Sequence, residues 1–505
     1  MEIPLPRLPG SRLTPIVKRL AKRRNLEGSS VPVSQTQSGP AGGPISLTRA
    51  LVFASAAVPI GALGVAATVH LPRYFAAELG LSLALVGTVF ALVRFIDIPI
   101  DTAMGLAMDR TKTRFGRYRV WMALGAPVLM LGFYMLLRTG SGDGPLYLGF
   151  WLLVMYLGYS GVLLSHLAWA GRLAPTYTER SRIFGAITGL GVIGAMAVLL
   201  IPIVMSQQGF TDAQGVQAMI WFIIAATAVT CMLVVFSSQE RIAQDRPAQF
   251  TLKDYAQLLT RGNVIRLLAA DLMVTLGPGW MAALYLFYFK DSRGFDTASA
   301  NLLLLIYVAA GFAGAPFAAW LANKVSKHIA FLVTTTIYSV GLMCLPFLPK
   351  GDFPIFSVLM FLVGAMAAGF TVMMRAIAAD IADELRLDSG REWMGLIYAG
   401  LTATSKLATA GAIFLTFNVL ALVGYQVGAG VTNTPDAIRG LELAYIVGPI
   451  IFVMAAGACF LGYKLTAERH AEIRHKLDLL DASETDPGAA AEALSGVDLG
   501  PKGRP

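Results

Sequence analysis

The sequence predicts an all-α polytopic membrane protein with twelve transmembrane helices in two six-helix halves. Two observations support this prediction. Of the 505 residues, 56% are hydrophobic and only 14% are Asp, Glu, Lys or Arg, whereas a soluble domain carries about 25% charged residues. In addition, apolar stretches near the length of about 20 residues that a bilayer requires recur along the chain. A soluble globular enzyme, a secreted disulfide scaffold and a disordered chain are therefore excluded.

The chain begins with a basic segment, residues 1–46, that is rich in Pro, Ser and Gly. No apolar core with a small-residue cleavage site follows the basic cluster, so this segment does not have the features of a signal peptide. We expect residues 1–46 to form a disordered basic tail in the cytoplasm.

Apolar blocks then alternate with short polar connections. Six of them form a predicted N-terminal half, residues 47–237, and six form a predicted C-terminal half, residues 263–464. A polar hinge loop, residues 238–262, separates the halves, and residues 465–505 form a second cytoplasmic tail. The hydrophobic pattern places the spans at residues 49–75, 83–108, 120–139, 146–171, 183–206, 216–237, 263–289, 299–322, 329–348, 355–380, 393–420 and 440–464.

The positions of Lys and Arg predict the orientation. If both termini and the even-numbered connections share one side, that side carries most of the 40 basic residues. By the positive-inside rule, the termini and the hinge loop then face the cytoplasm. The formal charge of +9 therefore reflects membrane topology, and we expect no nucleic-acid partner. The basic residues left for the opposite side are Arg73, Arg138, Lys290, Arg293, Lys350 and Arg439.

The second predicted span carries three charged residues, Arg94, Asp97 and Asp101. Each charge costs about 2.5–3.5 kcal/mol near the bilayer centre on the insertion scale, so the helix must turn these side chains away from lipid. Their i, i+3, i+7 spacing places them on one helical face. Pro99 lies between them and leaves the carbonyl of Phe95 without its helical donor. Two carboxylates one turn apart can hold a small cation or share a proton.

A structural ion-pair network, in which Arg94 balances one of the two carboxylates, is the alternative interpretation. Lys406 lies in the eleventh predicted span, four residues after Thr402. An ammonium group at that depth requires a carboxylate partner across the central cavity, and Asp97 or Asp101 is the expected one. Snorkelling of Lys406 to an interface is the alternative. For Asp271 in the seventh span, both a cavity and an interface position remain open.

Two blocks of sequence carry a family resemblance. The first runs from Gly80-Leu-Ser-Leu-Ala-Leu-Val-Gly87 through the charged residues of the second span to Trp121. The second runs from Ala379 to Lys406. Both blocks resemble the glycoside-pentoside-hexuronide:cation symporters, the melibiose permease group, and the layout of all twelve spans resembles the major facilitator fold. In that fold two halves rock around a site at the bilayer midplane.

The resemblance implies that Asp97 and Asp101 hold the coupling cation, H+ or Na+, together with Arg94 and Thr402, and that Lys406 links the cation site to the substrate site. Sodium-coupled members tend to carry Asn before the second Asp, where this chain has Ile100, so H+ is favoured. The resemblance also implies a cytoplasmic gate that latches the outward-open state. Its residues are Asp109, Arg110 and Arg114 in one half and Asp380, Asp383 and Arg391 in the other.

The substrate site is predicted at four positions. The galactoside-binding Asp residues of the melibiose permease group fall on Gly61 and Ser165, so a melibiose-type sugar clamp is in question. Trp169 and Tyr398 are candidates for stacking on a ligand. Because the family also includes lysolipid carriers, an amphipathic substrate stays open.

The sequence thus predicts a monomeric, cation-coupled symporter of a glycoside or another small polar solute, working by alternating access in a bacterial inner membrane. The alternatives are a proton-driven exporter, a carrier of lysolipids or other amphiphiles, and a non-transporting membrane sensor. We expect no enzyme, because the chain has no HExxH or GxSxG motif. We also expect no metal site and no cofactor apart from the coupling ion, since Cys231, Cys344 and Cys459 are far apart.

Overall fold

The computed structural model describes residues 46–78, 80–140, 142–173, 177–238, 240, 254, 257–428 and 431–485. Within these residues the regular secondary structure is entirely helical. The predicted N-terminal tail up to residue 45, most of the predicted hinge loop and the end of the C-terminal tail lie outside the described residues.

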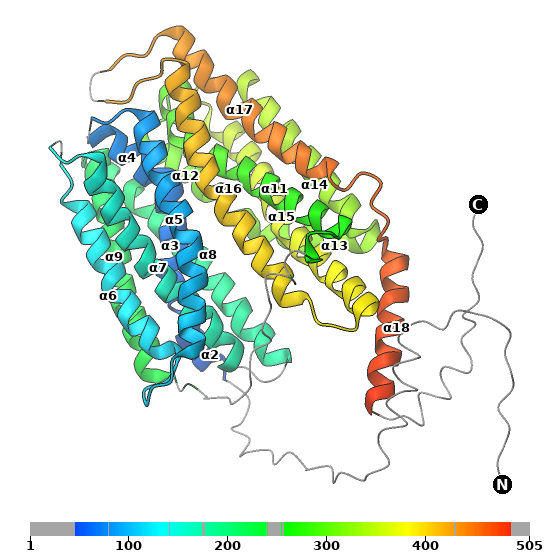
Figure 1. The fold of residues 1–505 in the computed structure, drawn as a ribbon. Coiled ribbons are helices and arrows are strands. Elements are labelled where there is room, and N and C mark those ends of the chain that lie inside the picture. The colour runs from blue at the N-terminus through cyan, green and yellow to red at the C-terminus, as the bar shows by residue number, and fades with distance from the viewer. Residues whose placement is uncertain are drawn as a thin grey trace, which may run out of the picture. The chain divides into compact units, whose positions relative to one another are not determined.

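The N-terminal half begins with a bent span. Helix α2 (Leu47–Ala54) is followed, at a bend of 41°, by α3 (Ala57–Val65), the π-helical turn η1 (Ala66–His70) and α4 (Leu71–Glu78). The other helices of this half are α5 (Leu83–Arg110), α6 (Tyr118–Leu137), α7 (Pro145–Leu173), α8 (Tyr177–Gln207) and α9 (Asp212–Ser237), shown from blue to green in Figure 1.

The C-terminal half contains the remaining spans. Its helices are α11 (Gly262–Phe287) with the π-helical turn η2 (Tyr288–Ser292), α12 (Thr297–Ala309), α13 (Gly311–Lys324), α14 (Lys327–Cys344) with the 3-10 turn η3 (Leu345–Phe347), α15 (Phe353–Ser389), α16 (Met394–Leu422) and α17 (Pro435–Ala458). A further helix, α18 (Ala467–Thr485), lies in the predicted C-terminal tail.

In the described part of the chain, eleven helices are long and apolar enough to cross a membrane, and the bent first pair makes twelve. This confirms the predicted fold class. The largest boundary difference concerns α15, which runs nine residues past the predicted end of the tenth span. The extra turns carry the charged residues Asp383, Glu384, Arg386 and Asp388 among apolar ones, so they lack the continuous apolar run of a span. The helix ends where Gly390 adopts a left-handed conformation with φ 67°, a common helix terminator.

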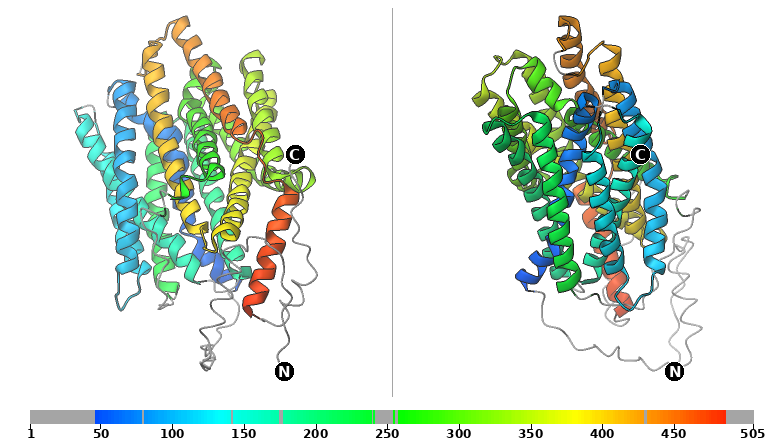
Figure 2. Two further views of the ribbon diagram at one scale, coloured as in Figure 1. Left: turned by 45° about the vertical axis from the view of Figure 1, so that its right-hand side comes forward. Right: turned by 90° about the vertical axis from the view of Figure 1, so that its left-hand side faces the viewer.

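Successive spans alternate in direction, so their connections lie at two ends of the bundle. We call one end the hinge face; it holds the end of α5, the end of α15, the start of α16, and α18 (Figures 1 and 2). We call the opposite end the far face; it holds the end of α4, η2 and the start of α17. Several far-face starts are capped by side chains, as where Thr211 and Gln214 form a capping box at α9.

The two halves contact each other through α5 with α16 and through α8 with α12. Figure 1 shows α5 and α16 side by side at the middle of the bundle. Large apolar side chains such as Leu146, Phe236 and Leu422 are more than four-fifths exposed on the outside, whereas Asp97 is fully buried inside. A surface with apolar groups outside and charged groups inside suits a lipid environment.

Candidate functional site

The charged residues of α5 meet the lysine of α16 at the middle of the bundle. Lys406 Nζ lies 3.2 Å from Asp97 Oδ2 and also forms an ion pair with Asp101. Arg94 Nη1 lies 3.5 Å from Asp97 Oδ2, and Ser160 of α7 donates a hydrogen bond of 3.3 Å to Asp97 Oδ1. We call Arg94, Asp97, Asp101 and Lys406 the central charge cluster. It joins the two halves of the protein.

The helix geometry explains why these side chains meet. Asp97 lies about 20 Å along α5 from either end, at 1.5 Å per residue, which is the depth of a bilayer midplane. Gly87 lets α5 approach α16 closely, because a Cβ at this position would lie 2.8 Å from Phe417 Cβ. Arg94 stacks on the ring of Tyr156 at 3.8 Å from its centroid, which supplies a cation–π contact in place of water.

The central charge cluster contains two positive and two negative side chains, so its formal charge is zero. Asp97 is fully buried, and the side chains of Arg94, Asp101 and Lys406 are only 12–15% exposed. One acceptor is left over, because Asp101 Oδ1 is buried without a hydrogen-bond partner in the described structure. A buried carboxylate oxygen without a donor is costly unless a proton or a cation satisfies it.

A cavity of about 1220 Å³ lies between the halves beside this cluster. One face of α16 lines it with Tyr398, Thr402, Ser405 and Thr409, at the spacing i, i+4, i+7, i+11. The cavity reaches Tyr398, one turn from the hinge-face start of α16, and therefore extends toward the hinge face. Lys406 lies on the adjoining face of the same helix, so α16 contacts both the cavity and the charge cluster.

The structure places Asp271 at the cavity wall. Its Oδ2 accepts hydrogen bonds from Thr404 at 2.6 Å and from Ser405 at 3.0 Å. Thr402, which the sequence places with the cation-binding residues, lines the cavity and donates to the carbonyl of Tyr398 at 2.9 Å. Its hydroxyl is thus directed to its own helix in this conformation.

Of the four predicted substrate residues, Tyr398 lines the cavity and the other three do not. Trp169 is fully buried and packs edge-to-face on Phe53 at 5.5 Å. Ser165 is buried and donates to the carbonyl of Gly161 at 2.6 Å. Gly61 contacts Gly191 of α8 so closely that a Cβ would overlap its carbonyl group. Trp169 and Ser165 are thus buried in helix packing, and Gly61 permits the close approach of α3 to α8. Matching of a single sequence does not distinguish such packing from ligand contact.

In this conformation the described structure shows no ion pair between the two groups of predicted gate residues. Asp109 accepts a hydrogen bond of 3.2 Å from Tyr118, and Arg114 lies 4.7 Å from the ring centroid of Phe115. Arg110 is exposed at the end of α5. The structure therefore does not bring this group together with the carboxylates of α15.

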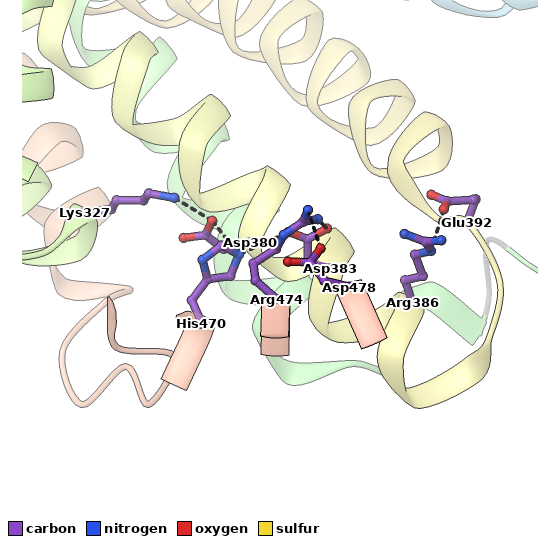
Figure 3. A network of polar contacts seen from close by, with 8 residues as sticks. All are labelled: Lys327, Asp380, Asp383, Arg386, Glu392, His470, Arg474 and Asp478. Carbon is purple, nitrogen blue, oxygen red and sulfur yellow. Dashed lines mark hydrogen bonds and ion pairs between the residues drawn. The ribbon is translucent and has the colours of Figure 1, made fainter. Parts of the chain in front are cut away.

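Helix α18 contacts those carboxylates instead (Figure 3). Asp380 pairs with Lys327 at 2.5 Å and with His470 at 3.2 Å. Asp383 pairs with His470 at 3.1 Å and with Arg474 at 3.4 Å. Ile473 and Leu477 of the same helix are almost completely buried, so α18 is docked by apolar as well as ionic contacts. The last predicted gate residue, Arg391, pairs with Asp254 of the hinge segment at 2.9 Å.

At the far face, ion pairs cross between the halves. Arg73 of α4 lies 3.4 Å from Asp291 of η2, and Lys290 of η2 pairs with Asp212 of α9. Thr297 of α12 donates to the same Asp212 carboxylate at 2.5 Å. We call these five residues the far-face clasp. It ties the halves together at the end of the bundle away from the cavity mouth.

The sequence interpretation missed the far-face clasp and one cavity residue. The clasp residues lie in different connections, and no sequence spacing shows which connections meet. Arg375 of α15 also lines the cavity, and here a signal was present, because a charged residue lies within the predicted apolar span 355–380. The periodicity of Tyr398, Thr402, Ser405 and Thr409 was a second available signal.

Residues 52–467 match the family described as MFS/sugar transport protein. The glucuronide carrier protein homolog of Escherichia coli (strain K12) is 24% identical over 80% of this chain and 90% of its own length. The isoprimeverose transporter of Lactiplantibacillus pentosus is 22% identical over 78% of this chain and 84% of its own. The sodium-dependent lysophosphatidylcholine symporter 1-B of Danio rerio is 20% identical over 90% and 94%, respectively.

Among solved structures, the crystal structure of the nucleoside transporter NupG superposes with a TM-score of 0.62. The aligned region covers 83% of this chain and 100% of that one, at 13% sequence identity. At this identity the similarity establishes the fold alone.

Proposed function

The chain belongs to the family of MFS/sugar transport proteins, and from this premise we propose that it is a symporter that couples a glycoside or another small polar solute to a cation by alternating access. The family match and the transporter and symporter names of the relatives confirm the resemblance drawn from the sequence. A multi-pass position in a bacterial inner membrane, with both termini in the cytoplasm, agrees with the distribution of basic residues.

The central charge cluster is the observation that carries this proposal. Its charges balance without an added ion, and Lys406 supplies the cation from the opposite half. A proton or metal cation that binds Asp97 and Asp101 must therefore compete with Lys406 for the same oxygens. Ion binding and the ionic contact between the halves therefore exclude each other. This mutual exclusion is a physical basis for coupling ion binding to a change of conformation.

Helix α16 extends this coupling to the solute. Ser405 donates to Asp271 at the cavity wall, and the next residue is Lys406 of the charge cluster. When an ion releases Lys406, the helix is free to shift or rotate, and the polar stripe that lines the cavity moves with it. The solute contacts the polar stripe of α16, and the same helix carries Lys406, whose release depends on ion binding to the carboxylates of α5.

The few oxygen ligands around the site favour H+ over Na+ as the coupling ion. Two carboxylates and the Ser160 hydroxyl surround the site, and Ile100 adds no oxygen where an Asn side chain would add one. Na+ binds best to several oxygen ligands, whereas a proton requires only one carboxylate. Na+ coupling is the alternative that the transport assay below distinguishes.

Alternating access agrees with the positions of the far-face clasp and the cavity. The clasp closes the far face, and the cavity extends toward the hinge face. Partly exposed ion pairs contribute about 0.2–1 kcal/mol each, so the two pairs can break during a transport cycle. With the hinge face in the cytoplasm, this conformation is the inward-facing one. The predicted gate would then form only after the halves rock to the outward-facing state.

A carrier of amphiphiles is the second candidate. The wall contributed by the N-terminal half includes Leu167, Phe184 and Ile187, which would contact an apolar chain. The similarity to a lysophosphatidylcholine symporter agrees with this candidate.

Transport by the purified protein in liposomes tests the proposal. Radiolabelled glycosides and lysolipids are offered with a proton gradient, a sodium gradient or neither. We expect accumulation of one solute class above equilibrium with the proton gradient. Accumulation that is equal under all three conditions would contradict coupling, and accumulation only with sodium would overturn the choice of ion. Asp436→Asn, at a side chain that is 91% exposed, is the matched control for loss of a carboxylate.

A further inference from the structure

Arg375 of α15 is a cation in the cavity wall without an ion-pair partner among the described residues. It lies within the predicted apolar span 355–380, five residues before its end at Asp380. A guanidinium at such a position is costly and is retained in membrane proteins mainly where it has a function.

The neighbouring polar groups leave the guanidinium of Arg375 available. The carboxylate among the cavity-lining residues, Asp271, accepts hydrogen bonds from Thr404 and Ser405 through Oδ2. It interacts with Arg375 through the Coulomb field but forms no ion pair or hydrogen bond with it among the described contacts. The Tyr398 hydroxyl of α16 donates to the main-chain carbonyl of Arg375 at 3.5 Å. This bond links α16 to α15 and does not involve the guanidinium of Arg375.

The opposite wall of the cavity has a different character. Leu167 of α7 and Phe184 and Ile187 of α8 line it with apolar groups, beside two threonines, Thr68 and Thr188, whose hydroxyls donate to carbonyls of their own helices. The cavity thus presents the guanidinium of Arg375 on one half and a largely apolar wall on the other. At about 1220 Å³ it has room for a solute that contacts both walls, since ligand sites typically measure about 300–1,000 Å³.

We propose that the cavity selects solutes that carry an acidic group, and that Arg375 is the residue that recognises this group. A guanidinium binds carboxylate, sulfate and phosphate oxygens through two parallel hydrogen bonds. The apolar wall would contact an aglycone or an acyl chain. This inference rests on the proposed function and adds the charge of the substrate to it. Asp271 disfavours a second acidic group and thereby orients the solute.

Two matched pairs of ligands test the proposal by thermal stabilisation of the purified protein. The first pair is 4-nitrophenyl β-D-glucuronide and 4-nitrophenyl β-D-glucoside, which differ in the carboxylate at C6. The second pair is lysophosphatidic acid and monoacylglycerol, which differ in the phosphate. The two arms distinguish an acidic sugar from an acidic lipid as the source of the anion.

We expect the acidic member of one pair to bind at least about 10-fold more tightly than its neutral partner, as a charged hydrogen bond implies. Arg375→Gln should remove that preference and leave binding of the neutral partner unchanged. Arg375→Lys keeps the charge without the two parallel donors, so it should retain part of the preference. Arg439→Gln, at an exposed arginine of the far face, is the control.

Equal binding within both pairs, or a preference that survives in Arg375→Gln, would overturn the proposal, as would failure of both acidic ligands to bind. These results are distinguishable from failure of the proposed function. Gradient-driven uptake of a neutral glycoside would leave the symporter standing without acid selectivity. Acid-selective binding without any response to an ion gradient would contradict the symporter alone.

Discussion

Replacing Asp97 by Asn should separate ion coupling from solute movement. Asp97 is fully buried between Lys406 and Arg94, at 3.2 and 3.5 Å. At an effective dielectric constant of about 20, each of these pairs has a Coulomb energy of about 5 kcal/mol. Part of this energy offsets desolvation, and breaking a buried pair costs about 3–5 kcal/mol in practice. The substitution leaves two cations facing Asp101 alone, so an added ion meets repulsion.

The expected result is a rise of at least about 100-fold in the ion concentration needed for uptake, since 1.4 kcal/mol corresponds to about tenfold. Gradient-driven accumulation in proteoliposomes should be lost, while exchange of labelled for unlabelled solute remains measurable. Accumulation by Asp97→Asn at the level of the unmodified protein would refute the assignment of Asp97 as an ion ligand.

A double variant distinguishes coupling from a structural role. Asp97→Asn lowers the stability of the protein because it unbalances the buried charges. Adding Arg94→Gln restores the balance, so we expect the melting temperature to recover while accumulation stays absent. If the cluster were only a structural ion-pair network, accumulation would return together with stability.

Three further predictions concern the charge cluster, the helix packing and the far-face clasp. Lys406→Gln removes the competitor for the carboxylates, so the half-saturating ion concentration should fall by about 10-fold or more in an uptake titration; a rise would count against competition. Gly194→Val forces a side chain into the backbone of α3 and should lower the free energy of unfolding by the ~1–3 kcal/mol typical of overpacking, which a lower melting temperature of the purified protein would report. Gly185→Val, on the same helix with open space, should leave the melting temperature unchanged. Lys290→Gln removes a clasp pair that contributes about 1 kcal/mol at most. Labelling of a Thr68→Cys probe in the cavity wall by a reagent added at the far face should therefore rise by up to about fivefold. Unchanged labelling would show that the clasp does not hold this face closed.

The hydrophobic pattern predicted the spans well because a bilayer imposes a length and an apolar composition on each helix. It predicted α15 too short, since the turns from Asp380 to Ser389 continue beyond the apolar segment. Helix α18 was missed for a related reason. Its docking depends on two apolar residues, Ile473 and Leu477, within a charged stretch that resembles a solvated tail.

The central charge cluster could be predicted because a charge in an apolar span has few alternatives. The cost of exposure to lipid forces Asp97, Asp101 and Lys406 inward, and inward they can only meet one another. Residues without such a constraint were harder to place. Ser165 and Trp169 satisfy the packing of α7 as well as they would satisfy a ligand, and their sequence does not distinguish these roles.

The most direct test of the central claim measures ion movement driven by solute alone. Proteoliposomes contain a pH-sensitive dye and no initial ion gradient, and the transported solute is added outside. Because ion and solute are proposed to move together through the release of Lys406, the lumen should acidify as solute enters, and Asp97→Asn should abolish the acidification. Solute entry at the normal rate with no movement of H+ or Na+ would contradict the account.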